Sequence, residues 1–187
     1  MDGYQFFEGV YVYFVTFTVV DWLPIFIHPE PIHNLIDSLV FCINEKFLRV
    51  HAYVIMPNHV HLVVFDAKFD NSRLQRTLAE FRKFTGHKLA DYIELKLPES
   101  YSALIRGHYQ TDRIRLIWKR GWHAEGLGSE AFLRQKVNYL HDNPVRKGYV
   151  RSPEHWRYSS AGCRINWEEG DIPISLVIAE EDMKRVG

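Results

Sequence analysis

The sequence has no long hydrophobic run, although 47% of its 187 residues are hydrophobic. No stretch approaches the ~20 consecutive apolar residues that a membrane-spanning helix needs. The opening residues, MDGYQFFEG, carry acidic side chains where a secretory signal would be positively charged, and no small-residue cleavage site follows an apolar core. The sequence therefore predicts a cytoplasmic protein that does not associate with membranes.

Cysteine is scarce, and Cys42 and Cys163 are isolated thiols outside any CxxC pattern. Neither a disulfide framework nor a zinc-thiolate site is indicated. The sequence also lacks a GxxxxGK(S/T) loop, internal repeats and low-complexity tracts, so nothing in it points to ATP-driven chemistry. At this length we expect one domain over residues 1–187, with a core from about 11 to 161 and an acidic C-terminal tail over 165–187.

The chain has no net charge, because 23 basic side chains balance 23 acidic ones. The balance is uneven, since residues 71–164 carry eighteen basic and nine acidic side chains and both ends are acidic. Such a segment suits single-stranded nucleic acid, to which backbone charge and base stacking both contribute. A solvated face with aromatic residues in the core explains this feature equally well. The aromatic residues interleaved with the basic ones are Trp118, Trp122, Tyr139, Tyr149, Trp156 and Tyr158.

Hydrophobic patterning predicts strands and a helix in the N-terminal half. β-Branched and aromatic residues in alternation are typical of strands, whereas apolar residues at three- and four-residue steps are typical of helices. Pro57 and Asn58 separate two short apolar runs, which indicates a hairpin. The predicted elements are a strand over 11–20, a helix over 31–47, and hairpin strands over 51–56 and 60–65.

The C-terminal half predicts two further helices and a fourth strand. Ser129 is a suitable N-cap for the last helix, which should end near Asn143 because Pro144 disfavours helical geometry before it. The complete order is that of a ferredoxin-like α+β sandwich, βαββαβ, with one helix appended and one sheet face left open. The predicted elements are a basic helix over 71–97, a loop over 98–112, a strand over 113–120 and a helix from 129 to about 143.

The HVH sequence at His59 and His61 is a candidate metal site. Residues two apart in a strand point to the same face with Cα atoms ~6.5 to 7 Å apart, so both imidazoles can bind one divalent ion. An HxH pair alone is a weak signal in a chain with ten histidines. It is more often a surface feature than a ligand set.

Tyr139, in VNYLHDNPV, is a candidate nucleophile. On a helix it shares a face with Asn143, four residues later, whose carboxamide oxygen is a reasonable third metal ligand. A free phenol has a pKa of ~10, so attack on phosphorus requires activation, usually by a metal on the scissile phosphate. A half-buried aromatic residue on an amphipathic helix is the plainer interpretation of the spacing.

Two sequence blocks resemble a known family. AYVIMPNHVHLVV looks like the HUH signature of transposases related to those of small single-strand insertion sequences. VNYLHDNPVRKGYVRSPEHWRYSSA is similar to the tyrosine block of the repetitive-element-associated tyrosine transposases. Between them, LAEFRKFTGHKL resembles the family's basic helix and IWKRGWHAEGL its fourth-strand block. The resemblance runs from about Tyr13 to Ala161, with the blocks in the family's order.

The resemblance implies a fold, a cofactor and a reaction. It implies a ferredoxin-like domain that uses Mg²⁺ or Mn²⁺ to cleave and rejoin single-stranded DNA, with the tyrosine attached to a 5′ phosphate. His59, His61, Tyr139 and Asn143 match the family's working positions. The expected substrate contains a hairpin, and the family includes both monomers and homodimers. The basic residues that we expect to contact DNA are Arg82, Lys83, Lys88, Lys119, Arg120, Arg146 and Lys147.

The chain departs from the family at one block and allows two rival functions. Trp122-His123-Ala124-Glu125 stands where relatives commonly have an aromatic-Asp-His sequence, which leaves any role of that Asp and His in doubt. The first rival is a non-catalytic nucleic-acid-binding regulator descended from a transposase. The second is a metal phosphoesterase with water as nucleophile, which would need carboxylates near the histidines. Asp66 is the one carboxylate close in sequence.

Overall fold

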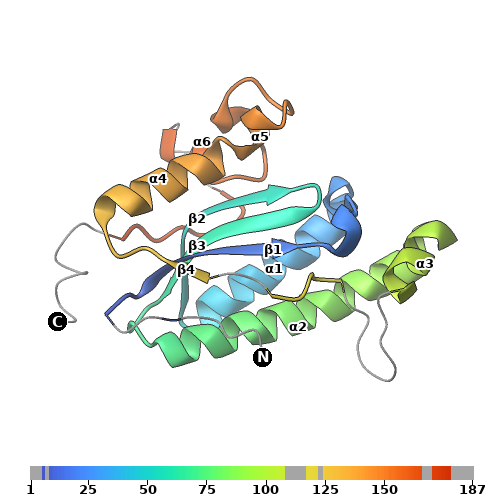
Figure 1. The fold of residues 1–187 in the computed structure, drawn as a ribbon, viewed down its shortest axis with the longest axis horizontal. Coiled ribbons are helices and arrows are strands. Elements are labelled where there is room, and N and C mark those ends of the chain that lie inside the picture. The colour runs from blue at the N-terminus through green and yellow to red at the C-terminus, as the bar shows by residue number, and fades with distance from the viewer. Residues whose placement is uncertain (1–5, 7–8, 108–116, 122–123, 166–169, 178–187) are drawn as a thin grey trace.

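The computed structural model describes residue 6 and residues 9–107, 117–121, 124–165 and 170–177. Its centre is a four-stranded antiparallel sheet with the order β2-β3-β1-β4 (Figure 1). Three of these strands confirm the strand and hairpin predictions. The strands are β1 (Val12–Thr18), β2 (Leu48–Met56), β3 (His59–Asp66) and β4 (Ala124–Gly126).

Helices α1 (Pro29–Glu45) and α2 (Asn71–Lys96) cover one face of the sheet (Figure 1). Both confirm the predictions from helical spacing. The Asp70 carboxylate caps α2 by accepting a hydrogen bond of 2.8 Å from the backbone N–H of Arg73. Alternate strand residues meet these helices in the larger hydrophobic core, which holds the central strands in place.

Helix α4 (Glu130–His141) lies over the opposite face of the sheet (Figure 1). It begins as predicted, with the Ser129 hydroxyl accepting a hydrogen bond of 3.2 Å from a first-turn N–H. The prediction of an open sheet face is wrong, because α4 buries its apolar side there. This second core includes Phe14, Val63, Leu133, Val137 and Leu140.

The fourth strand does not occupy the predicted range of 113–120. Residues 113–116 lie outside the described residues, and Trp118 forms only an isolated bridge to Val19. The Trp118 side chain is buried, and its indole N–H donates a hydrogen bond of 3.0 Å to the Thr85 hydroxyl. Gly121 has a φ of 70°, a left-handed conformation that glycine adopts without strain. Among the described residues of this region, the named strand is β4, which lies after the predicted range.

The predicted loop over 98–112 is wrong for its first part, where helix α3 (Glu99–Gly107) forms. Residues 108–112 lie outside the described residues. Pro98 separates α3 from α2 as expected, but a new helix starts directly after it. Glu99 lies in the first turn, and Ile105 is fully buried.

The chain after α4 folds back along β2. Helix α5 (Asn143–Arg146), a 3-10 turn (Pro153–His155) and α6 (Ala161–Ile165) follow one another. Backbone hydrogen bonds join Ile55 N–H to the Tyr158 carbonyl at 2.8 Å and Ser160 N–H to the Tyr53 carbonyl at 3.0 Å.

Among the described residues, no helix has both the length and the apolar character of a membrane span.

Candidate active site

His59 and His61 lie side by side on β3, on the face that α4 covers. Their ring centroids are 4.7 Å apart, and each side chain is only 6% exposed. Their neighbours in alternation, Val63 and Phe65, belong to the core beneath α4. The spacing predicts this shared face, and the structure shows it. The pair is thus fixed by a strand that is hydrogen-bonded on both sides.

A second polar group holds each imidazole at Nδ1. His61 Nδ1 lies 2.7 Å from the hydroxyl of Thr16, which stands directly opposite in β1. His59 Nδ1 lies 2.7 Å from Oδ1 of Asn58, whose amide N–H donates to the Trp22 carbonyl at 3.3 Å. If both rings donate from Nδ1, Nε2 keeps the lone pair on each. This is the tautomer that binds a metal through Nε2.

Both histidines are neutral near pH 7. Burial, reinforced by the positive charge of Lys147, lowers the pKa of His59 to about 4. Burial also dominates at His61 and lowers its pKa to about 3. The other contributions at His61 come from His59, Arg146 and Lys136. A neutral imidazole needs no deprotonation before it binds a metal.

Asn143 reaches the histidine pair from the start of α5. Its amide Nδ2 lies 3.4 Å from His59 Nε2, and the side chain is 3% exposed. The prediction places Asn143 on the same helix as Tyr139, but α4 ends before Asp142 and Pro144 starts a new helix. A half-turn of the amide exchanges its nitrogen for its oxygen. Among the described residues, no third His, Cys, Asp or Glu joins the pair.

Tyr139 lies on α4 at the edge of the histidine pair. Its ring centroid is 5.8 Å from that of His61 and 6.0 Å from that of Phe14, and the side chain is 41% exposed. The Arg146 guanidinium carbon lies 4.0 Å from the centre of the tyrosine ring. A solvent-accessible phenol, a cation and two imidazoles therefore meet within one chain.

No family model matches the chain, but two comparisons find similar proteins. A curated Haemophilus influenzae protein, provisionally named a REP-associated tyrosine transposase, is 27% identical over 109 residues. That match spans 58% of this chain and 56% of the relative. This chain is similar to a REP-associated tyrosine transposase. A solved structure described as a REP-associated tyrosine transposase bound to a REP hairpin has the same fold, with a TM-score of 0.60. It is 16% identical, and the match covers 97% of this chain and 96% of that one.

The expected DNA-binding residues fall into two groups. Lys119, Arg146 and Lys147 lie near the histidine pair: Lys119 beside Trp22, Arg146 over Tyr139, and Lys147 close enough to lower the pKa of His59. Arg120 is exposed next to Lys119. The other three, Arg82, Lys83 and Lys88, lie on α2, across the sheet from the site.

The α2 group differs in what its members contact. The Arg82 guanidinium donates to the backbone carbonyls of Trp118 and Lys119, so it anchors the segment before β4. Lys83 is exposed, and the Lys88 ammonium lies 5.8 Å from the ring centre of Phe84. Residues 122–125 form the block that differs from the family's pattern, and its first two residues, Trp122 and His123, lie outside the described residues.

Sequence reasoning missed several residues around the site. Thr16 and Asn58 hold the two imidazoles, and Lys136 lies over the Tyr139 ring at 5.9 Å while its ammonium pairs with Glu125 at 2.5 Å. Asn58 directly precedes the HVH motif, which was an available signal. Thr16 was not identifiable, because its pairing with His61 depends on the register between β1 and β3.

Asp66 has a structural role at the far end of β3. Its carboxylate accepts two hydrogen bonds from the Arg73 guanidinium, at 2.7 and 2.5 Å, and one of 2.7 Å from the backbone N–H of Lys68. Burial raises the pKa of Asp66, but these hydrogen bonds outweigh burial and hold the pKa below its usual range. The carboxylate is therefore committed to Arg73 and is not a ligand beside the histidines.

We expect Asp66→Asn to destabilise the fold without stopping DNA cleavage. Loss of the charge weakens the partly buried hydrogen bonds between Asp66 and Arg73, at a cost of about 1–3 kcal/mol. Because folding lowers the Asp66 pKa, its contribution is complete above the unfolded pKa of ~4 and disappears as pH falls through the folded value. Thermal melting from pH 7 to pH 3 should show the two proteins converging in acid. Loss of cleavage by a folded variant would instead revive the water-nucleophile rival.

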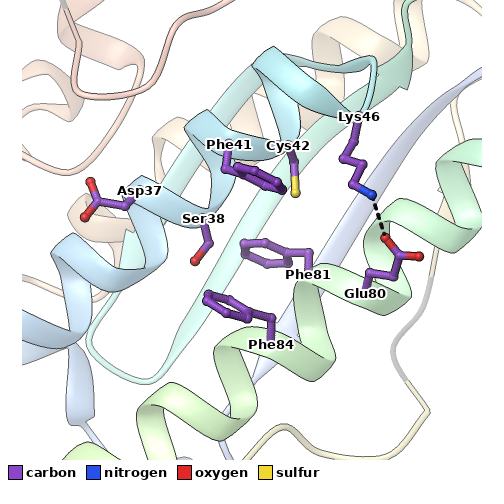
Figure 2. Close-up of a pocket in the computed structure, with 8 residues that line it drawn as sticks. All are labelled: Asp37, Ser38, Phe41, Cys42, Lys46, Glu80, Phe81 and Phe84. Carbon is purple, nitrogen blue, oxygen red and sulfur yellow. Dashed lines mark ion pairs between the residues drawn. The ribbon is translucent and has the colours of Figure 1, made fainter.

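A separate apolar hollow of about 520 Å³ lies between α1 and α2 (Figure 2). Phe41, Phe81 and Phe84 line it, with the Lys46–Glu80 ion pair of 3.5 Å at one end. It lies on the opposite side of the sheet from the histidine pair. Its one thiol, Cys42, is a poor nucleophile because burial raises its pKa to about 11. The hollow therefore does not compete with the histidine pair as a reaction site.

Proposed function

We propose that this protein is an HUH-type enzyme that cuts and rejoins single-stranded DNA through a covalent 5′-phosphotyrosine. One observation carries the proposal: Tyr139 contacts His61 while Asn143 contacts His59, so a nucleophile and a set of metal ligands converge from α4, α5 and β3. The relationship to the REP-associated tyrosine transposases supports a DNA substrate with a hairpin.

We propose that His59, His61 and Asn143 hold a divalent ion, Mg²⁺ or Mn²⁺. When bound, this ion would polarise the scissile phosphate and stabilise the charge that develops on it. The donor set supports the assignment, because two neutral imidazoles and one carboxamide oxygen leave coordination positions for phosphate oxygens and water. The Nδ1 partners, Thr16 and Asn58, would keep both Nε2 atoms directed at the same point.

Tyr139 then attacks phosphorus in line with the bond to the 3′ oxygen of the preceding nucleotide. The tyrosine O–P bond forms and the P–O3′ bond breaks, which leaves a free 3′ hydroxyl upstream and a 5′-phosphotyrosine downstream. The phenolic proton passes to solvent, and the departing oxygen takes a proton from water. Arg146 and Lys136 place positive charge over the ring, which favours negative charge on the attacking oxygen.

Rejoining reverses this step. A 3′ hydroxyl attacks the phosphotyrosine, a new P–O3′ bond forms, and the phenol is released. The bond energy is conserved in the adduct, so no nucleotide triphosphate is consumed. Because Tyr139 contacts His61 of its own chain, we propose that one subunit supplies both nucleophile and metal ligands, and that a homodimer is not needed for the chemistry.

We also infer that the fold is the ferredoxin-like sandwich. The strand order β2-β3-β1-β4, with α1 between β1 and β2 and α2 between β3 and β4, supports this assignment. Helix α3 and the short β4 would then be local variations on it. The appended helix α4 would present Tyr139 across the second face of the sheet.

Hairpin-containing single strands from the DNA that flanks the coding gene are the appropriate test substrates. With Mg²⁺ or Mn²⁺, a 3′-end-labelled strand should give a protein adduct that survives denaturing electrophoresis, and a 5′-end-labelled strand should give a free, shorter product. The two labels distinguish the rivals. A non-catalytic regulator binds without any product, and a water-dependent phosphoesterase releases both ends free.

We expect at least about tenfold more adduct from the hairpin-flanked single strand than from a fully paired duplex of the same sequence. Stacking on aromatic side chains requires unpaired bases. Exposed aromatic residues are available on the α5 side, where Tyr149 is 51% exposed and stacks on Trp156 at 5.4 Å. Equal cleavage of the duplex, measured at the same salt concentration, would refute the single-strand model.

A further inference from the structure

Trp22 stands at the edge of the candidate active site without a role in the reaction described above. Its ring centroid is 6.1 Å from that of His59, with the two rings nearly perpendicular, and the side chain is 55% exposed. The other hydrophobic residues near it in sequence behave differently, since Val20 and Leu23 are buried in the main core. The indole is therefore directed out of the core at the position where the histidine pair begins.

The backbone at Trp22 adopts an unfavourable conformation. Asp21 and Trp22 have φ values of 51° and 56°, so two successive residues with side chains occupy the left-handed region. The surrounding hydrogen bonds fix this conformation: Val19 N–H donates to the Asn58 carbonyl at 2.9 Å, and Val20 N–H donates to the Ile117 carbonyl at 2.8 Å. Strain that the fold maintains around an exposed indole points to a function for that indole.

A cation accompanies the exposed ring. The Lys119 ammonium lies 4.3 Å from the centre of the Trp22 ring. The segment that carries Lys119 is anchored, because Lys119 N–H donates to the Thr18 carbonyl at 2.8 Å and Arg82 binds the Lys119 carbonyl. An aromatic face next to a cation matches the two parts of one nucleotide, a base that stacks and a phosphate that carries negative charge.

Ring contacts link this subsite to the nucleophile. Trp22 contacts His59, His59 contacts His61, and His61 contacts Tyr139, at centroid distances of 6.1, 4.7 and 5.8 Å. Tyr139 and Trp22 thus flank the histidine pair at opposite ends. An in-line displacement places the attacking and leaving oxygens on opposite sides of phosphorus, so the leaving nucleotide lies on the Trp22 side.

We propose that Trp22 and Lys119 form a binding site for a single unpaired nucleotide, the one whose 3′ oxygen leaves the scissile phosphate. Trp22 stacks on its base, and Lys119 contacts its phosphate. The assignment of this nucleotide relative to the cleaved bond rests on the proposed function. The existence of a nucleobase site beside His59 does not rest on the proposed function, because it is inferred from the exposed, strained indole and the cation beside it.

Binding without cleavage tests the nucleobase site directly. Fluorescence anisotropy in EDTA would compare a labelled dT12 strand with a 12-residue abasic strand that has the same phosphates. Trp22→Ala should weaken dT12 binding by about 5- to 100-fold while leaving abasic binding nearly unchanged, because stacking on one base is lost. Trp22→Phe should retain most of the dT12 affinity. Lys119→Ala should weaken both strands alike and reduce the salt dependence.

Phe41→Ala is the matched control, because Phe41 is 54% exposed on α1, across the sheet from the site. It should leave the preference for dT12 unchanged. Thermal melting confirms that each variant is folded. The nucleobase site is refuted if the wild type binds both strands equally, or if Trp22→Ala affects both strands equally or neither.

Adduct formation tests the position of the nucleotide. A single abasic residue immediately 5′ of the cleaved bond should slow adduct formation by the wild type and have little further effect on Trp22→Ala. If an abasic residue 3′ of the bond shows that pattern instead, the positional assignment is wrong. The wild-type protein could prefer dT12 through Trp22 and yet form no adduct with any hairpin substrate. That result would support the nucleobase site and contradict the proposed function.

Discussion

Tyr139→Phe is expected to abolish the covalent protein–DNA adduct while leaving the fold and hairpin binding nearly unchanged. The substitution removes one hydroxyl and keeps the ring that contacts His61, Phe14 and Arg146. A single hydroxyl contributes ~0.5 to 1.5 kcal/mol to a contact, so affinity for the hairpin should fall by less than about tenfold. Denaturing electrophoresis with a 3′-end-labelled strand measures the adduct, and anisotropy measures binding.

Tyr149→Phe is the matched control for the nucleophile. Tyr149 is also exposed, at 51%, and follows Tyr139 in the same sequence block, but its ring stacks on Trp156. This variant should form adduct at the wild-type rate, and peptide mapping of the wild-type adduct should place the DNA on the segment from Val137 to Asn143. An adduct on Tyr149 or Tyr158, or one that survives in Tyr139→Phe, would show that the nucleophile is assigned wrongly. Cleavage by the wild type without any adduct would refute the mechanism itself.

The sequence predicted those parts of the fold that repeat a local pattern. Residues of α1 and α2 recur at helical spacing, and the hairpin strands are continuous apolar runs around a two-residue turn. Alternation in a strand also predicts correctly that His59 and His61 share one face. In each case the signal lies within about twenty-five neighbouring residues, so no knowledge of tertiary packing is needed.

Elements that depend on distant contacts were placed wrongly or missed. β4 is three residues long and is defined by its pairing with β1, so its own sequence carries no alternation to detect. Within the described part of the alternating segment, Trp118 is buried and donates a hydrogen bond to Thr85 of α2. The prediction of an open sheet face failed for the same reason. It took no account of the apolar side of α4, which covers part of the sheet.

The geometry of the candidate site likewise depends partly on local sequence spacing and partly on contacts between residues distant in sequence. The HVH spacing is local, whereas the approach of Asn143 to His59 spans 84 residues and that of Thr16 to His61 spans 45. Asn143 is the first residue of α5, directly before Pro144, and its amide reaches His59 from there. The helix was predicted to end near Asn143; α4 ends at His141, and Asp142 keeps an αR backbone between α4 and α5.

His59→Ala and His61→Ala are each expected to reduce metal-dependent cleavage to background while leaving hairpin binding within a few-fold. One remaining imidazole with one carboxamide is too few protein ligands to hold a divalent ion, so loss of either histidine removes the charge stabilisation at phosphorus. EDTA should have the same effect on the wild type, and added Mg²⁺ or Mn²⁺ should restore only the wild type. Adduct formation measures cleavage, and anisotropy in EDTA measures binding.

His87→Ala, at an exposed position on α2, is the matched control and should cleave normally. Thr16→Val is expected to have a partial effect on metal binding, because it keeps both histidines but removes the oxygen 2.7 Å from His61 Nδ1. Loss of such a partner typically costs about 10- to 100-fold in metal affinity or activity. Higher Mn²⁺ concentration should therefore restore Thr16→Val but neither alanine variant. Undiminished Mg²⁺-dependent cutting by a folded His59→Ala or His61→Ala protein would show that the imidazole pair, although buried and correctly spaced, does not hold the metal.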